Sequence, residues 1–367
     1  MTKRNRFIDI AKGISIILVL FNHYEWSKDS LLNTHLYYWL ITLAVPVFML
    51  GTGYVSAASF ERKGISLAEA KRKEQIIPKI KRYTIPFLWF YIAETILTYI
   101  SVKAGFLQYI STLNFPYSGG YANKSMTLSG SITYFFAGGR GQHGTYYFPV
   151  IIQIVFLMPY IYNTVKKSKN GVWKCFAVTV LLDIMIALIS NITDVNISAF
   201  YNRMISFRYI FALALGCYIY VYKADLGKIK WWIMFFLGIG YTCLVTYIPS
   251  YKPLVYSSWK YTSALSMLYI APLFVFGMKH FGNIRCKPIE EIGKASYHIL
   301  MVQILYYNFL APLIWTAPKN IIPNAAIGFA ISLVICIVGG YGYYRLYTFA
   351  AKRLKKQTNS TKRTQKR

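Results

Sequence analysis

Long apolar runs recur along the whole chain, and they limit its fold more than any other feature. Each run has about 20 residues, the length that an α-helix needs to cross the roughly 30 Å hydrocarbon core of a bilayer. Backbone groups in hydrocarbon must bond to one another, so these runs predict helices. About ten spans are expected, at 7–26, 36–58, 84–104, 145–163, 173–190, 204–222, 230–248, 261–279, 297–315 and 325–347.

The composition excludes an ordinary soluble globular protein. Apolar residues make up 56% of the 367 positions and charged residues only 14%, whereas a soluble domain would be far more charged. We therefore predict an all-α polytopic membrane protein with one transmembrane domain over residues 1–350. The polar, basic tail 351–367 is expected to be disordered.

Two further features complete this frame. The first apolar run is full length and lacks a small-residue cleavage site, so it is expected to remain in the protein. The five cysteines include no CxxC pair and lie mostly inside the predicted spans. They predict neither a disulfide framework nor a metal site.

The net charge of +29 raises the question of nucleic-acid binding. About three quarters of the Lys and Arg residues fall in the N-terminal segment, in alternate loops such as 59–83, and in the tail, which is the positive-inside pattern. It predicts that both termini are cytoplasmic, and it favours an even number of spans. The charge is then a feature of topology and of anionic lipid contact, and nucleic acid is not an expected partner.

The first span is unusual because it carries Asp9, Lys12, His23 and Glu25. Ionisable groups inside a membrane are costly and usually functional. Lys12 and His23 are eleven residues apart, so on a helix they differ by about 20° in direction and roughly 16 Å along the axis. They share one face, whereas Glu25 meets His23 only if the helix unwinds there. The alternative is that Lys12 and His23 are interfacial anchors.

These residues resemble a known family. The stretch "RFIDIAKGISIILVLFNHYE" is similar to the first helix of the acyltransferase 3 family of integral-membrane O-acyltransferases, in which a basic residue precedes a histidine by ten intervening residues. Lys12 and His23 match that pattern. Lys79 and Arg82, in "IPKIKRYTIPFLWFY", match the family's two basic residues three apart at the start of the third span.

Two later stretches extend the resemblance to about residue 310. "IEEIGKASYHILMVQILYY" resembles the family's late Gly-Lys-x-Ser-Tyr helix opening, and "HGTYYFPVIIQIVFLMPYI" resembles its aromatic fourth span. The chain departs from the family pattern in two ways. Gln303 stands where many members have a histidine, and Tyr146 and Tyr147 stand where a Trp is more common.

The resemblance implies an enzyme that moves an acyl group from cytoplasmic acyl-CoA, with acetyl-CoA as the expected donor, to a sugar hydroxyl of a cell-surface or cell-wall polysaccharide. His23 is then the general base, since imidazole exchanges protons near neutral pH, and Glu25 orients or balances it. Lys12, Lys79 and Arg82 are expected to hold the donor's anionic groups. On their own, the last two also fit simple topology retention. No tightly bound cofactor is expected.

A glycine-rich segment before the fourth predicted span holds Arg140 and His143. Placed on the outer side, they are predicted to contact the acceptor or a developing oxyanion, with ordinary loop residues as the alternative. Asp183 and Arg208 lie inside spans and are expected to form an interhelical pair. Glu94 is a further charge at that depth, and His298 is expected to be solvated or interfacial.

Two other function classes stay open at this point. A polar line inside ten helices also describes a transporter or flippase for a polysaccharide or its lipid-linked precursor. A non-catalytic subunit of a glycan synthesis complex is the third hypothesis. The expected partners are acyl-CoA, a glycan acceptor, the lipid bilayer and the glycan synthesis machinery, and the expected location is a bacterial plasma membrane crossed several times.

Overall fold

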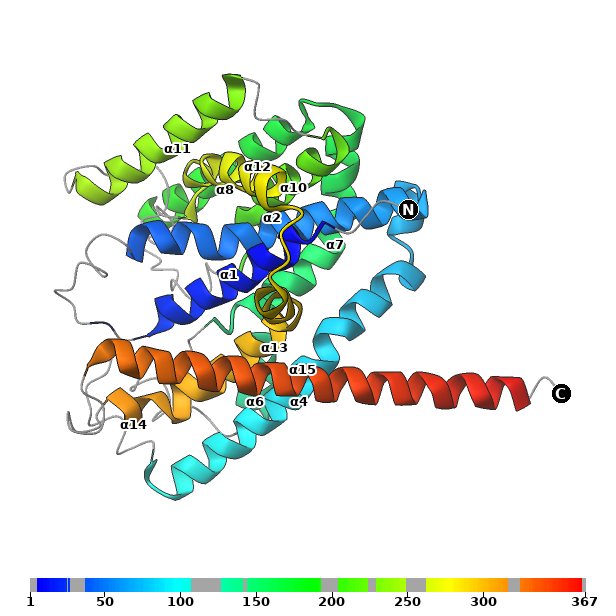
Figure 1. The fold of residues 1–367 in the computed structure, drawn as a ribbon, viewed down its shortest axis with the longest axis vertical. Helices are drawn as coiled ribbons and strands as arrows, with labels where there is room; N and C mark the ends of the chain where they lie inside the picture. The colour runs from blue at the N-terminus through cyan, green and yellow to red at the C-terminus, as the bar shows by residue number, and fades with distance from the viewer. Residues whose placement is uncertain are drawn as a thin grey trace.

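The computed structural model describes residues 5–24, 26, 37–106, 127–140, 144–192, 204–223, 229–248, 262–315 and 324–364. Within these ranges every regular element is a helix (Figure 1), which confirms the all-α prediction. The elements are α1 Phe7–His23, α2 Tyr37–Lys63, α3 Leu67–Ala70, α4 Lys73–Lys103, α6 Leu128–Phe136, α7 Tyr147–Lys167, α8 Gly171–Ile192, η3 Ser206–Tyr209, α10 Ile210–Val221, α11 Ile229–Tyr247, η5 Ser266–Leu268, α12 Ile270–Phe281, α13 Lys287–Phe309, α14 Ala311–Trp315 and α15 Ala325–Thr364.

Six helices within the described ranges are long and apolar enough to cross a membrane. They are Tyr38–Lys63, Leu67–Lys103, Tyr147–Lys167, Gly171–Ile189, Ile229–Tyr247 and Ala325–Arg353. The other four predicted spans are also helical, but they fall outside this group. Helix α1 has 17 residues and α12 has 12, while α13 begins with charged turns. The total of about ten spans and the side on which the termini lie stay predictions.

The basic ends of several helices gather on one side of the molecule. Figure 1 shows that α2 ends, α4 begins and α15 projects at the same side. These ends carry Arg62 and Lys63 on α2, Lys73 on α4, and Lys352 and Arg353 on α15. The arrangement agrees with the predicted positive-inside topology.

Helix α15 is longer than its predicted span. It continues to Thr364, whereas the sequence predicted a disordered tail from residue 351. The stretch after Gly342 has neither Gly nor Pro and is rich in Ala, Lys, Arg and Leu, which favour helices. Extending an existing helix costs no new nucleation step, so these residues continue α15.

Helix α1 lies between α2 and α13, and its contact with α13 is backbone against backbone. A Cβ atom added to Gly13 would come within 2.4 Å of the Ile289 carbonyl oxygen, and one added to Gly293 within 1.9 Å of the Asp9 carbonyl oxygen. Only glycine lets two helix backbones approach this closely, as is common in membrane helix pairs. This contact fixes how α1 and α13 face each other.

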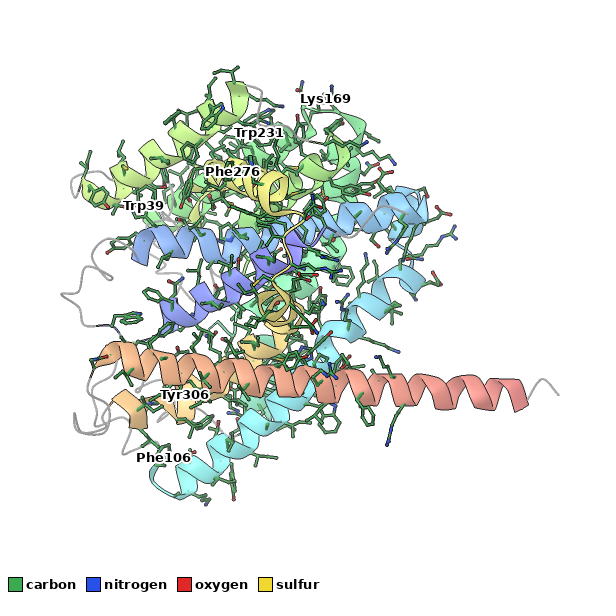
Figure 2. The ribbon with its side chains drawn as sticks, viewed as in Figure 1. Trp39, Phe106, Lys169, Trp231, Phe276 and Tyr306 are labelled. Carbon is green, nitrogen blue, oxygen red and sulfur yellow. The ribbon has the colours of Figure 1, made fainter. Side chains whose placement is uncertain are left out.

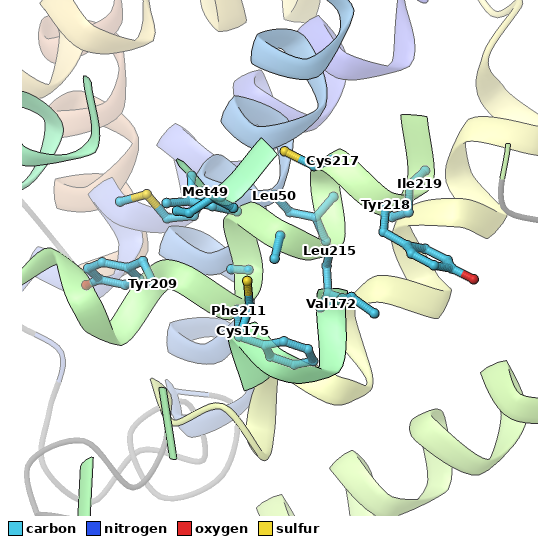
Figure 3. Packing of buried hydrophobic residues seen from close by; sticks show 14 of the residues in the cluster. Met49, Leu50, Val172, Cys175, Tyr209, Phe211, Leu215, Cys217, Tyr218 and Ile219 are labelled. Atoms are coloured by element: carbon cyan, nitrogen blue, oxygen red, sulfur yellow. The ribbon is translucent and has the colours of Figure 1, made fainter. Parts of the chain in front are cut away.

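Two hydrophobic cores flank this pair. The larger one joins α2, α7, α8, α10 and α12, and Figure 3 shows Met49, Leu50, Phe211 and Leu215 packed within it. The smaller one joins α1, α13 and α15, where the hydroxyl groups of Tyr306 and Ser332 are 2.8 Å apart. Figure 2 shows Tyr306 beside α15.

The buried charge on α8 has the neighbour that the sequence suggested. Asp183 is buried and lies within the electrostatic reach of Arg208, at the start of the α10 segment. Arg208 also donates a hydrogen bond to the Thr262 hydroxyl. These contacts link three chain segments inside the bundle, which supports the interpretation of this pair as a packing feature.

The α1–α13 contact predicts a sharp difference between two glycine substitutions. Gly293→Ala should lower stability by about 1–3 kcal/mol, because its methyl group forces two backbones apart. Gly240→Ala is the matched control, since a Cβ there meets nothing within 4 Å and alanine favours the helix. Thermal unfolding of the purified variants in detergent measures both. Equal unfolding temperatures for Gly293→Ala and wild type would contradict the contact.

Candidate active site

Helix α1 ends at His23, and side chains from elsewhere hold that end in place. The Tyr307 hydroxyl donates a 2.9 Å hydrogen bond to the Leu20 carbonyl, and the Trp26 indole donates one of 2.9 Å to the Phe21 carbonyl. Carbonyls in the last turn of a helix have no partner within the helix, so these bonds satisfy them. They fix the position from which the imidazole of His23 projects.

Gln303 on α13 is a polar partner of His23. The amide nitrogen of Gln303 is hydrogen-bonded to Nδ1 of His23, and the Gln303 side chain is fully buried. A glutamine amide can offer either an N–H donor or an oxygen acceptor to an imidazole nitrogen. When the oxygen faces Nδ1–H, Nε2 is left as the basic atom; when the NH₂ faces Nδ1, the proton lies on Nε2. Gln303 can thus orient the ring in either form.

Gly144 forms another wall beside the imidazole. A Cβ atom there would lie 3.4 Å from Cε1 of His23 and 3.3 Å from Cδ1 of Leu300, and the residue has φ +92°. A side chain at this φ is strained. The glycine therefore lets the backbone before α7 lie directly against the ring of His23.

The preceding glycines bring this backbone to a buried carboxylate. The backbone N–H of Arg140 donates a 2.8 Å hydrogen bond to Oε2 of Glu94 on α4. Its guanidinium donates to the Ser131 hydroxyl at 2.6 Å, and the residue is only 1% exposed. A Cβ atom on Gly138 would come within 1.9 Å of the Thr145 carbonyl oxygen. Arg140 is thus held against Glu94, and Gly144 lies against His23.

Three predicted site residues of this region keep roles that stay predictions. Arg140 belongs to the buried network around Glu94 and Ser131, so any contact with an acceptor stays a prediction. His143 and Glu25 lie outside the described residues, and their roles also stay predictions. Among the described residues, no three His, Cys, Asp or Glu side chains gather in a way that would hold a metal ion.

Lys12 lies between α1 and α2. Its side chain is half-buried and crosses α2 at Gly51, where a Cβ atom would lie 3.6 Å from Cε of Lys12. The missing side chain at Gly51 leaves space for the lysine stem. Lys12 therefore lies inside the bundle, on the same face of α1 as His23 and nearer to the start of the helix.

The predicted donor residues Lys79 and Arg82 lie on α4, near the C-terminal end of α2. Lys79 is half-buried, with Nζ 4.5 Å from the centroid of the Phe60 ring, a cation–π contact. Arg82, three residues later on α4, is exposed. A 2.6 Å hydrogen bond from Nζ of Lys63 to Oε1 of Gln75 joins the end of α2 to the start of α4.

The helix geometry gives the distance from the donor residues to His23. Phe60 and Gly51 are nine residues apart, about 13 Å along α2, and Lys12 and His23 are about 16 Å apart along α1. Helices α1 and α2 run antiparallel (Figure 1), so the two distances extend in the same direction. Lys79 and His23 are thus roughly 30 Å apart along the axes, about the thickness of the hydrocarbon core.

One prediction from the sequence is wrong. His298 was expected to be solvated or interfacial, but it is only 7% exposed. Helix α15 covers this part of α13, because Gly340 lets its backbone lie against Ile299, with a Cβ distance of 2.4 Å to Cα. No local pattern around His298 indicates this burial, since the covering residues are more than forty positions away.

A comparison with protein families agrees with the motifs. The model of the acyltransferase 3 family, described as an acyltransferase domain, matches residues 5–341 of the chain. The chain belongs to the acyltransferase 3 family. Comparison with curated proteins and with solved structures gave no match.

Membership of the acyltransferase 3 family indicates that the chain functions as a membrane acyltransferase. The matched range includes His23, Gln303, Lys12, Lys79 and Arg82. The contact between His23 and Gln303 was not expected from the sequence. The one available signal was that Gln303 stands where many acyltransferase 3 proteins carry a second histidine.

The orienting role of Gln303 gives a prediction. Gln303→Leu should lower kcat about 10- to 100-fold with little change in the donor KM, because losing a buried partner costs about 1–3 kcal/mol. The matched control is Asn308→Leu on the same helix. Its Nδ2 is buried without a hydrogen-bond partner among the described residues, so activity should be kept. An unchanged kcat in Gln303→Leu would contradict the role.

Proposed function

We propose that this acyltransferase transfers an acyl group from cytoplasmic acyl-CoA to a sugar hydroxyl of a cell-surface or cell-wall polysaccharide. Acetyl-CoA is the expected donor, which makes the product an O-acetylated glycan. The observation that carries the proposal is the separation of roughly 30 Å between the cations at Lys79 and the imidazole of His23. A donor site and a base separated by this distance would suit transfer across a membrane.

The row of polar side chains gives the donor a direction. Lys79 and Arg82 would hold the phosphates at the basic side of the molecule, with Arg as a bidentate fork and Lys as a mobile point charge. Lys12 lies part-way along, where it would attract an anionic or polarised part of the donor. The thioester would then reach the end of α1.

The chemistry at His23 follows from its position. Nε2 would take the proton of the sugar hydroxyl while the hydroxyl oxygen attacks the thioester carbonyl. The carbon–sulfur bond breaks, the CoA thiolate leaves, and the proton passes from the imidazolium to the thiolate. For this cycle the Gln303 amide would turn so that its oxygen accepts from Nδ1–H, which leaves Nε2 to face the reacting atoms.

The general base gives the direct test of this function. His23→Gln and His23→Ala should lower acetyl transfer about 10²- to 10⁴-fold, the usual contribution of a positioned base. Membrane abundance and acyl-CoA binding should stay close to those of wild type. Transfer from labelled acetyl-CoA to surface polysaccharide, measured in isolated membranes, gives the rate.

A control variant and the two alternative functions each predict a different result. His280→Gln changes an exposed histidine on α12 that packs on Phe276, with ring centroids 4.4 Å apart, and should keep the full rate. A transporter would move glycan without any acyl donor, and a non-catalytic subunit would do neither. Wild-type transfer by His23→Gln would remove the general base from this account.

A further inference from the structure

A second histidine, His298 on α13, has no assigned role. His298 is 7% exposed, and neither Nδ1 nor Nε2 has a hydrogen-bond partner among the described residues. Leaving a buried polar group without a partner costs roughly 1–3 kcal/mol. Most buried polar groups in proteins are paired for this reason. Among the described residues, this imidazole is therefore available to a ligand.

Four tyrosines surround this imidazole, and we call them the tyrosine cage. Their ring centroids lie 5.0–6.0 Å from that of His298. The members are Tyr297, Tyr343, Tyr344 and Tyr347.

Two cage hydroxyls are already engaged by α4. Tyr297 donates to the Tyr83 carbonyl at 3.1 Å, and Tyr343 donates to the Pro86 carbonyl at 2.5 Å. These two hydrogen bonds therefore link α13 and α15 to α4. They leave the imidazole of His298 as a free donor and acceptor inside the cage.

The cage lies where two basic helices diverge. Helices α4 and α15 cross at the bond between Tyr343 and Pro86 and then separate toward their basic ends (Figure 1). Arg82 lies next to Tyr83, whose carbonyl accepts the hydrogen bond from Tyr297, the neighbour of His298, so Arg82 lies near the cage. Arg345 lies exposed on α15.

Glu291, on α13 near the cage, is already paired. Lys294 donates a 2.6 Å hydrogen bond to Glu291, and that bond holds the pKa of Glu291 below its ordinary value. The charge of Glu291 is therefore offset, and the nearby cation Arg82 suits an anion.

We propose that His298 and Arg82 form a binding site for a phosphate ester at the crossing of α4 and α15. The imidazole N–H and the guanidinium fork are donors that match phosphate oxygens. Tyr344 and Tyr347 are half-buried, so their side chains close the cage on its outer side and would move to admit the ligand. Two sources share this chemistry: the nucleotide phosphates of an acyl-CoA donor, which rests on the proposed function, and the headgroup of an anionic phospholipid.

The first experiment tests the nucleotide source. Adenosine 3′,5′-bisphosphate, the nucleotide part of CoA without its acyl arm, is titrated by calorimetry into the full chain in phosphatidylcholine nanodiscs. His298→Phe keeps the aromatic packing but has no ring nitrogen, and it should weaken binding about tenfold. His280→Phe is the matched control and should bind like wild type. Arg82→Gln, a change at an exposed position, should weaken binding to a similar extent even if His298→Phe folds poorly.

The second experiment tests the lipid source without any nucleotide. The variants are purified from membranes that contain phosphatidylglycerol, and mass spectrometry measures the phosphatidylglycerol that stays bound. Loss of that lipid in His298→Phe and Arg82→Gln, but not in His280→Phe, supports the site with a headgroup as ligand. Weaker bisphosphate binding in His298→Phe and Arg82→Gln supports the same site with the acyl-CoA donor as ligand.

Two negative results have different meanings. If neither ligand changes by more than about twofold in folded His298→Phe and Arg82→Gln, the phosphate site is overturned. If the wild type binds no bisphosphate and transfers no acetyl group, the proposed function fails, and the lipid experiment still decides the site at His298.

Discussion

The contact between the backbones of α1 and α13 is the constraint on which the rest of the site depends. Gly13 and Gly293 let the two helices meet without side chains between them. The same approach brings His23 next to Gln303 and lets the Tyr307 hydroxyl reach the Leu20 carbonyl. A larger residue at Gly293 would separate both pairs at once, so the packing and the chemistry rest on the same contact.

Polar groups inside the bundle are held by specific partners, and these partners shape the surroundings of His23. Glu94 accepts a hydrogen bond from the backbone of Arg140, and this bond holds Arg140 against α4. In a membrane interior each such bond avoids a large desolvation cost. Gln303 on α13 and Gly144 before α7 therefore lie beside the same imidazole.

Some of this arrangement could be predicted from the sequence, and some could not. Hydrophobic run length gave the all-helical fold, and the period of 3.6 residues aligned Lys12 with His23, because both signals are local. The burial of His298 and its tyrosine cage depends on α15, which lies far along the chain, so no local pattern contains it. The partner of Gln303 and the fold of the segment around Arg140 likewise arise from contacts between distant helices. The helical extension of α15 shows that a polar tail continues a helix once its nucleus exists.

The central claim is that donor and acceptor meet across the membrane, and its most direct test is the sidedness of transfer. Inside-out membrane vesicles enclose the glycan, labelled acetyl-CoA is supplied only outside, and the label on enclosed and external glycan is measured. Wild type should acetylate the enclosed glycan, and His23→Gln should not. Label on external glycan alone would contradict the separation of Lys79 from His23 as the path of the acyl group.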